Sequence, residues 1–490
     1  MFISVNAGPG SGKTYTICLS YLVHQCNANI PKNTTDEQHF IFDYIRKELP
    51  QTKKVAFFAH TNSVKDTLIR RLPSNLHKYV KTYHGHGQSA LIGRYGYQRP
   101  VNNRLDTFIS HTTGKSLYDL PKAQIKEWIA IKRLVNCFKQ EFVLPSQESF
   151  NYCIEKYPEL GDCLFPIDWL SRCNKLMNLS SKVDGTVEYS DMLWLAAKTC
   201  FKPKYDIGYV DECQDLSGAS LELVRRLCKD VVFVGDPNQA IMAFCGADER
   251  MFNKVQAHSE AVLPLKTTFR CPPNIIERAN DLIPNSVLPG PNTKVGHDKT
   301  ITYSEYLKRI STLTPVNNDG SYHTLTLART NAPLIGVGTT LLQKKVPAKL
   351  ADKDLGNRLI KYVQGLRCGS ISNLGRALED SVSAACKFRN KFYAIVIEEQ
   401  AHCIMALSSG CSSLTALYDK IKAVCNVDDK SAHLLSTIHK AKGLEAEVVF
   451  ILDPPVEHPL SAGHPIAGPQ ETNLHFVALT RTKRDLFWVR

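Results

Sequence analysis

Residues 7–14 combine glycines, a lysine and a hydroxyl in an order that suits phosphate binding: AGPGSGKT follows a short apolar run at residues 2–5. Glycines allow backbone N–H groups to turn toward phosphate oxygens, and a helix that starts at this loop adds partial positive charge. Lys13 can then reach the β- and γ-phosphates of a nucleotide, and the Thr14 hydroxyl can bind Mg²⁺. The predicted nucleotide-binding residues are Ala7, Gly8, Pro9, Gly10, Ser11, Gly12, Lys13 and Thr14.

Two adjacent carboxylates, Asp211 and Glu212, follow a second apolar run at residues 207–210. Asp211 is placed to hold Mg²⁺, and Glu212 to polarise an attacking water as a general base. The alternative is that these carboxylates cap a helix. A preceding strand, in a chain that also has a phosphate loop, favours the catalytic interpretation.

Short apolar runs that end in polar or glycine-rich segments recur along the chain, with helix-like stretches such as residues 63–72 between them. This alternation predicts a parallel α/β sheet, in which ligands gather beyond the carboxyl ends of the strands. The predicted strands cover residues 2–5, 55–58, 207–210 and 231–234 in a first unit, and 323–328, 448–452 and 486–489 in a second. Residues 86–184 and 346–429 lack this rhythm and are predicted to be mainly helical insertions, one in each unit.

Together the segments resemble the UvrD/Rep-type branch of superfamily 1 helicases, and they follow in order along almost the whole chain. Besides the phosphate loop and DECQD at 211–215, they are AHTN at 59–62, TYHG at 82–85, EYSDML at 188–193, GDPNQ at 235–239 continuing to 247, TFR at 268–270, RTN at 329–331, TIHKAKGLE at 437–445 and VALTRTK at 477–483. The resemblance implies an α/β fold with two RecA-like P-loop NTPase domains. We expect domain 1A at 1–85 and 185–270, insertion 1B at 86–184, domain 2A at 271–345 and 430–490, and a reduced insertion 2B at 346–429.

The same resemblance assigns roles to further residues, with ATP and Mg²⁺ as the expected cofactors. Gln239 would sense the γ-phosphate, Arg270 and Arg481 would neutralise charge on the transferring phosphoryl group, and Glu445 would contact the ribose. Nucleic-acid contacts are expected from Thr61, Asn62, Tyr83, His84, Phe244, Arg329, Asn331 and His439. The aromatic rings of Tyr83 and Phe244 can serve equally as base-stacking platforms or as core residues.

The composition is that of a folded protein with a basic surface. The net charge of +13 suggests a polyanionic partner, although a solubilising surface explains it equally well. The 16 cysteines include no C-x-x-C pair, which favours reduced, buried thiols over a zinc site or disulfides. No apolar run approaches the ~18 residues of a membrane span and the start of the chain does not read as a signal peptide, so we expect a soluble, cytoplasmic protein.

The functional expectation is an ATP-dependent DNA helicase or single-strand translocase acting on single-stranded and tailed duplex DNA. The 3′→5′ direction follows from the resemblance alone. Two alternatives stay open: an ATPase stimulated by single-stranded DNA that remodels protein–nucleic-acid complexes without unwinding, and a nucleotide-gated nucleic-acid-binding protein. Repair, replication, recombination and a viral programme all fit the sequence.

Overall fold

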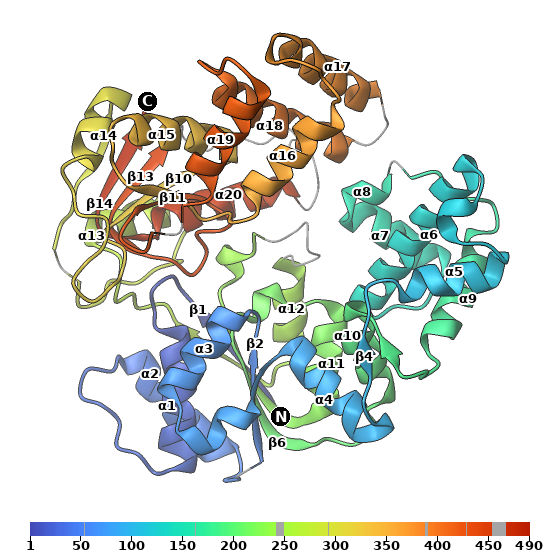
Figure 1. Ribbon diagram of the computed structural model, residues 1–490. Helices are drawn as coiled ribbons and strands as arrows, with labels where there is room; N and C mark the ends of the chain where they lie inside the picture. The colour runs from blue at the N-terminus through green and yellow to red at the C-terminus, as the bar shows by residue number, and fades with distance from the viewer. Residues whose placement is uncertain are drawn as a thin grey trace. The chain divides into compact units, whose positions relative to one another are not determined.

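The computed structural model describes residues 1–52, 54–161, 163–241, 249–292, 294–387, 391–427, 429–452 and 467–490 of the chain. The chain divides into two compact units, Met1–Thr267 and Thr268–Arg490. Each unit contains a six-stranded parallel sheet flanked by helices (Figure 1). The predicted α/β class is therefore confirmed.

The sheet of the first unit contains the four strands that the sequence predicts and two more at its edges. In spatial order its strands are β3 (Val80–Thr82), β2 (Val55–Ala59), β6 (Tyr205–Val210), β7 (Cys228–Gly235), β1 (Phe2–Ala7) and β8 (Ala261–Leu265). The edge strands β3 and β8 escaped prediction because β3 has three residues and β8 carries Pro264, which only an edge strand tolerates.

Helices cover both faces of this sheet, as Figure 1 shows for α1, α2 and α3 on one side and α4, α10 and α11 on the other. Neighbouring residues of β2 alternate between two cores, with Phe57 in one and Phe58 in the other. This explains why the strand is apolar throughout. The helices are α1 (Lys13–Gln25), α2 (Asp36–Glu48), α3 (Asn62–Arg71), α4 (Tyr83–Tyr95), α10 (Tyr189–Thr199), α11 (Gly218–Leu227) and α12 (Glu249–Ala257).

A helical segment interrupts the first unit between α4 and α10. It contains α5 (Arg104–Thr113), α6 (Lys122–Glu141), α7 (Gln147–Lys156), α8 (Pro158–Gly161) and α9 (Trp169–Ser180). The paired strands β4 (Arg99–Pro100) and β5 (Thr186–Val187) lie where the segment leaves and rejoins the rest of the unit. These helices fall within residues 86–184, which the sequence predicts to be a mainly helical insertion.

Buried ion pairs join this helical segment to α10. The carboxylate of Asp191, in α10, accepts hydrogen bonds from Lys139 Nζ at 2.7 Å and from Arg104 Nη1 at 2.8 Å. The side chains of Asp191 and Lys139 are both 0% exposed. A second buried pair, Lys156 with Glu141 at 2.9 Å, lies within the segment itself. Charges at this depth persist only when they are paired, so the helices and α10 depend on each other.

The second unit repeats the parallel arrangement. Its strands, in spatial order, are β11 (Ala348–Leu350), β12 (His433–Thr437), β10 (Thr324–Ala328), β13 (Ala446–Leu452), β14 (Thr482–Val489) and β9 (Asp298–Ile301). Its helices are α13 (Pro273–Leu282), α14 (Tyr303–Ile310), α15 (Asn331–Gln343), α16 (Leu355–Gly365), α17 (Leu374–Lys387), α18 (Lys391–Ser408), α19 (Leu414–Cys425) and α20 (Ala467–Leu479). The predicted strands correspond to β10, β13 and β14. Strand β11 pairs with β12 although it falls inside the stretch expected to be an insertion, because three residues are too few to show in the pattern.

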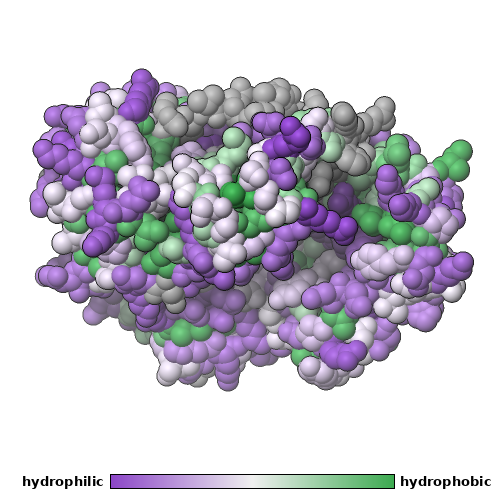
Figure 2. All heavy atoms as spheres, turned by 45° about the horizontal axis from the view of Figure 1, so that its top comes forward, coloured by the Kyte–Doolittle hydropathy of each residue, from purple (hydrophilic) through white to green (hydrophobic). Residues whose placement is uncertain are grey.

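Within the described parts of the chain, no helix is both long and apolar enough to cross a membrane. On the face drawn in Figure 2, hydrophobic residues gather in separate patches among hydrophilic ones. Every cysteine among the residues that the structure describes is free.

Candidate functional site

The phosphate loop runs between strand β1 and helix α1, as its sequence predicts. Gly10 and Gly12 adopt φ values of 68° and 80°, in the left-handed region that favours glycine. Ser11 Oγ donates to the Gly8 carbonyl at 2.9 Å, and the Gly8 N–H donates to the Leu265 carbonyl of β8 at 2.8 Å. Because Gly12 is the N-cap and has no side chain to cover the first turn of α1, that turn offers its N–H groups to an anion.

Thr14 and Asp211 place two oxygen atoms that can ligate a metal next to each other beside this loop. Thr14 Oγ1 donates to Asp211 Oδ2 at 2.5 Å, and Asp211 is buried directly after β6. Burial, followed by the nearby Glu212 charge, raises the pKa of the Asp211 carboxyl to about 7. A hydroxyl and a carboxylate form the hard oxygen set that Mg²⁺ prefers, and a divalent cation would favour the charged carboxylate. The residues present therefore fit the predicted metal.

Glu212 is held in an uncommon backbone conformation next to Lys13. Its φ of 53° lies in the left-handed region, which a non-glycine residue adopts at an energetic cost of order 1–3 kcal/mol. The Lys13 ammonium lies 3.8 Å from Glu212 Oε1, and Gln214 Nε2 donates to Glu212 Oε2 at 2.6 Å. The strained turn thus presents the carboxylate beside the phosphate loop, where a general base is needed.

A chain of hydrogen bonds connects Glu212 to Gln239. Gln214 Oε1 accepts a hydrogen bond from the Asp236 N–H at 3.0 Å, and Gln239 Nε2 donates to Asp236 Oδ2 at 2.6 Å. The loops after β6 and β7 approach so closely that a Cβ on Gly235 would lie 2.6 Å from Cys213 Sγ. Asp236 and Gln214 were not among the predicted site residues, although their places in GDPNQ and DECQD were a signal.

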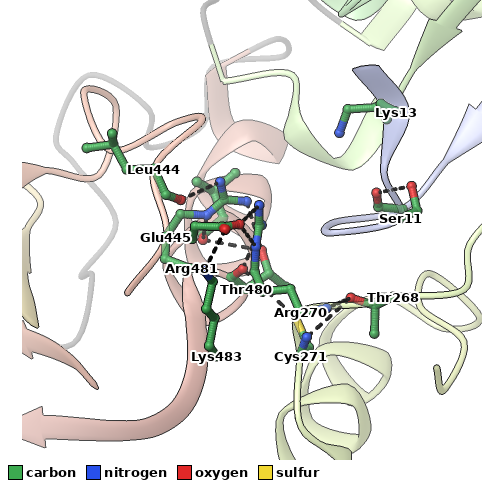
Figure 3. Close-up of polar contacts among 12 residues, drawn as sticks. Ser11, Lys13, Thr268, Arg270, Cys271, Leu444, Glu445, Thr480, Arg481 and Lys483 are labelled. Atoms are coloured by element: carbon green, nitrogen blue, oxygen red, sulfur yellow. Dashed lines mark hydrogen bonds and ion pairs between the residues drawn. The ribbon is translucent and has the colours of Figure 1, made fainter. Parts of the chain in front are cut away.

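In the second unit, three predicted residues gather in one cluster, which Figure 3 shows. Arg270 Nε donates to Glu445 Oε2 at 2.6 Å, and Lys483 Nζ lies 2.8 Å from Glu445 Oε1 (Figure 3). Burial alone would raise the pKa of the Glu445 carboxyl, but Arg270 and Lys483 lower it to about 2. Arg481 is 1% exposed, and it donates to the carbonyls of Val477 and Leu444. The second unit thus concentrates cations around one carboxylate.

Asn292 holds this cluster together through the main chain. Its Nδ2 donates to the carbonyl of Arg270 at 2.8 Å and to that of Lys483 at 3.0 Å. One amide therefore fixes the two segments that supply the cations around Glu445. No local sequence pattern pointed to Asn292, because its partners are far from it in the chain.

The predicted nucleic-acid residues of the first unit lie in different environments. Thr61 and Asn62 are exposed at the start of α3, and His84 packs against the ring of Tyr189 at 5.2 Å. Tyr83 is 4% exposed, and its hydroxyl donates to the Asp211 carbonyl at 3.4 Å. Tyr83 was predicted to be either a base-stacking platform or a core residue, and its burial favours the core role. The side chains of Tyr83 and His84 also line a pocket of about 330 Å³.

In the second unit, two of the residues predicted to contact nucleic acid, Arg329 and Asn331, donate hydrogen bonds to carboxylates. Arg329 makes a two-pronged interaction with Glu471, the shorter bond being 2.7 Å. The main-chain and side-chain N–H groups of Asn331 both donate to Glu399 at 3.0 Å. His439 is partly buried after β12. Phe244 lies outside the described residues.

Fold and phosphate loop together define the class of P-loop nucleotide-binding α/β proteins. Residues 2–260 match the UvrD/REP helicase N-terminal domain, and residues 400–489 match the UvrD-like helicase C-terminal domain. The chain therefore belongs to the UvrD/REP helicase family, and the resemblance carried by its motifs is confirmed.

Three curated relatives illustrate how far the similarity extends. The chain is 26% identical over 296 residues to the "ATP-dependent DNA helicase HMI1, mitochondrial" of Saccharomyces cerevisiae, covering 57% of this chain and 38% of that protein. It is 28% identical over 303 residues to the "F-box DNA helicase protein 1" of Schizosaccharomyces pombe, covering 58% and 34%. For the "F-box DNA helicase 1" of Gallus gallus the values are 24% over 346 residues, covering 62% and 32%. The chain spans about a third of the length of these relatives.

Proposed function

We propose that this protein is an ATP-dependent DNA helicase or single-strand translocase that moves 3′→5′. The observation that carries the proposal is the continuous set of contacts from the phosphate loop through Thr14, Asp211 and Glu212 to Gln239. Such a chain lets the state of a phosphate group change the positions of loops elsewhere in the unit. Family membership and the names of the relatives, which include DNA helicases, support DNA as the partner.

The chain's own residues divide the chemical work. Bound ATP with Mg²⁺ would supply the phosphoanhydride bond that is cleaved. Lys13 and the loop amides would bind the phosphates, while Thr14 and Asp211 would hold the metal. Glu212 orients the attacking water and takes its proton, and Gln239 responds to the γ-phosphate.

The second unit contributes cations and the ribose contact. Arg270 and Arg481 neutralise the charge on the phosphoryl group, as arginine fingers do. Glu445 binds the ribose, which requires it to exchange its present partners, Arg270 and Lys483, for the nucleotide. The positive field around Glu445 is therefore part of the proposed site.

The proposed domain organisation keeps 1A at 1–85 and 185–270, 1B at 86–184, 2A at 271–345 and 430–490, and 2B at 346–429. Residues 268–270, which end 1A in this scheme, belong to the second compact unit. Apart from Phe244, which lies outside the described residues, the proposed DNA track uses side chains near the ends of strands or the starts of helices in each unit. Its residues are Thr61, Asn62, His84, Phe244, Arg329, Asn331 and His439. Tyr83 is left out because its ring belongs to the core.

ATP hydrolysis, measured with and without single-stranded DNA, tests the proposal. We expect DNA to stimulate turnover, Lys13→Ala to abolish it, and Glu212→Gln to retain nucleotide binding while losing turnover. Unwinding of 3′-tailed against 5′-tailed duplexes then tests direction. Stimulated hydrolysis without strand separation would favour a remodelling ATPase, and turnover indifferent to DNA would favour a nucleotide-gated binding protein.

A further inference from the structure

The ends of α4 and α10 bring together aromatic and basic side chains that the nucleotide site does not use. The two helices lie side by side (Figure 1), and Arg94 Nη1 donates to the Thr199 carbonyl at 2.6 Å. The Arg94 guanidinium also lies 5.4 Å from the ring centroid of Tyr95 and 5.1 Å from that of Phe201. We define the α4–α10 patch as Arg94, Tyr95, Tyr97, Phe201, Lys202 and Lys204.

The aromatic rings of this patch are unusually exposed. Phe201 is 70% exposed and Tyr97 is 72% exposed. A single exposed ring is ordinary, but several on two contacting segments indicate a surface that meets a partner. The rings lie in the same two segments as the basic residues, so the partner must satisfy both kinds of group.

The charge on these segments has one sign. Residues 67–105, which include α4, contain no aspartate or glutamate, and neither do residues 192–205, which include the end of α10. Lys204 and Arg94 are close enough to act on the same thiol, since both lower the pKa of Cys200 against the larger, opposing effect of burial. The patch is therefore complementary to a polyanion.

The patch lies away from the phosphate loop. Lys204 immediately precedes β6, whereas Asp211 follows its end. Six residues at a rise of ~3.3 Å place the two ends of β6 about 20 Å apart. A ligand of the patch is thus separate from the nucleotide and from the strand ends where the DNA track is proposed.

We propose that the α4–α10 patch binds single-stranded nucleic acid outside that track. Phosphates meet Arg94, Lys202 and Lys204, and bases stack on the open faces of Tyr97 and Phe201, an arrangement suited to sequence-tolerant binding of single strands. An acidic peptide would satisfy the charge but would make little use of the ring faces. A strand held at both places stays near the protein when one of the two attachments opens.

Anisotropy measurements on the full chain without nucleotide test this inference. The probes are fluorescent oligothymidylates of about ten nucleotides, a length typical of one local site, and of about thirty, which is long enough to reach the patch as well. For Phe201→Ala we expect affinity for the long probe to fall about tenfold, which is within the range for removing one ring on which a base stacks. The short probe should bind as it does to the wild type.

Matched controls separate the patch from general effects. Phe40→Ala removes an exposed ring from α2, and Lys47→Glu changes an exposed charge on the same helix. Both should leave the affinity for the long probe unchanged. Lys202→Glu with Lys204→Glu should flatten its salt dependence, by ~0.7 in log–log slope for each phosphate that is no longer neutralised by a lysine.

The outcome is decided without any ATPase measurement, so it is distinct from the test of the proposed function. Wild-type affinity for the long probe in both patch variants, with wild-type melting temperatures, would overturn the inference. The inference would also be overturned if polyglutamate bound to the patch and an oligothymidylate could not displace it. A 5-iodouracil probe that crosslinks to the peptide containing Phe201, but not to the Lys202→Glu, Lys204→Glu double variant, would support it.

Discussion

Replacing Asp191 by asparagine should strongly destabilise the first unit. Asp191 accepts from Lys139 at 2.7 Å and from Arg104 at 2.8 Å, and Asp191 and Lys139 have no exposed surface. An asparagine keeps one acceptor oxygen but removes the charge, so Lys139 stays buried without compensation. Breaking a buried pair in this way costs about 3–5 kcal/mol, a large part of the ~5–15 kcal/mol that stabilises a domain.

The chain offers a control with the same chemistry near the surface. Asp106 accepts from Lys132 Nζ at 2.6 Å, but the two side chains are 19% and 26% exposed. Because water can replace the missing partner there, Asp106→Asn should cost at most about 1 kcal/mol. Urea unfolding at pH 7, followed by hydrogen exchange of the α6 amides, measures both variants on the same scale.

Two outcomes would refute this reasoning. The first is a loss for Asp191→Asn no greater than that for Asp106→Asn. The second concerns the double variant Asp191→Asn with Lys139→Met, which removes the uncompensated ammonium. If the penalty arises from that charge, part of the stability should return. A further loss in the double variant would mean that packing, and not charge, explains the effect.

Three further predictions concern other parts of the molecule. In Gly235→Ala the added Cβ must displace Cys213 Sγ. Turnover should therefore fall at least about tenfold, equivalent to ~1.4 kcal/mol, while nucleotide affinity is retained. Gly208→Ala, whose Cβ would lie 2.7 Å from a cysteine sulfur within the sheet, is the control for strain alone. Asn292→Ala removes two hydrogen bonds at ~0.5–1.5 kcal/mol each and should lower kcat more than it changes KM; unchanged kinetics would deny Asn292 a positioning role. Burial and, to a smaller extent, Lys81 and Lys204 lower the pKa of His86 to about 3. Since the unfolded value is ~6.5, stability should be complete above pH 6.5 and decline as pH falls toward 3, by up to ~1.4 kcal/mol per pH unit. Denaturation curves at pH 7 and pH 5 would show this slope and its loss in His86→Gln; equal slopes in the two proteins would contradict it.

Most central strands could be predicted because a strand covered on both faces is apolar throughout, as β2 is. The exception is β12, which is central in the second sheet and was not predicted. The edge strands could not, since β8 contains a proline and β11 has only three residues. Likewise, the phosphate loop is contiguous and shows its chemistry locally. The bridging role of Asn292 depends on two carbonyls brought together by folding, and the burial of Tyr83 depends on how α4 packs, so neither was readable in advance.

The hydrogen bond from the Gly8 N–H to the Leu265 carbonyl places the phosphate loop next to the start of the connection between the units. The next two amides, those of Lys266 and Thr267, donate to Glu37 at 2.9 and 2.8 Å, and the second unit begins at Thr268. The loop predicted to bind phosphate is therefore hydrogen-bonded, main chain to main chain, to the segment that leads into the second unit. Side-chain substitutions leave the Gly8–Leu265 hydrogen bond in place. Replacing the Gly8 amide by an ester would remove the donor of this bond and leave every predicted catalytic side chain unchanged.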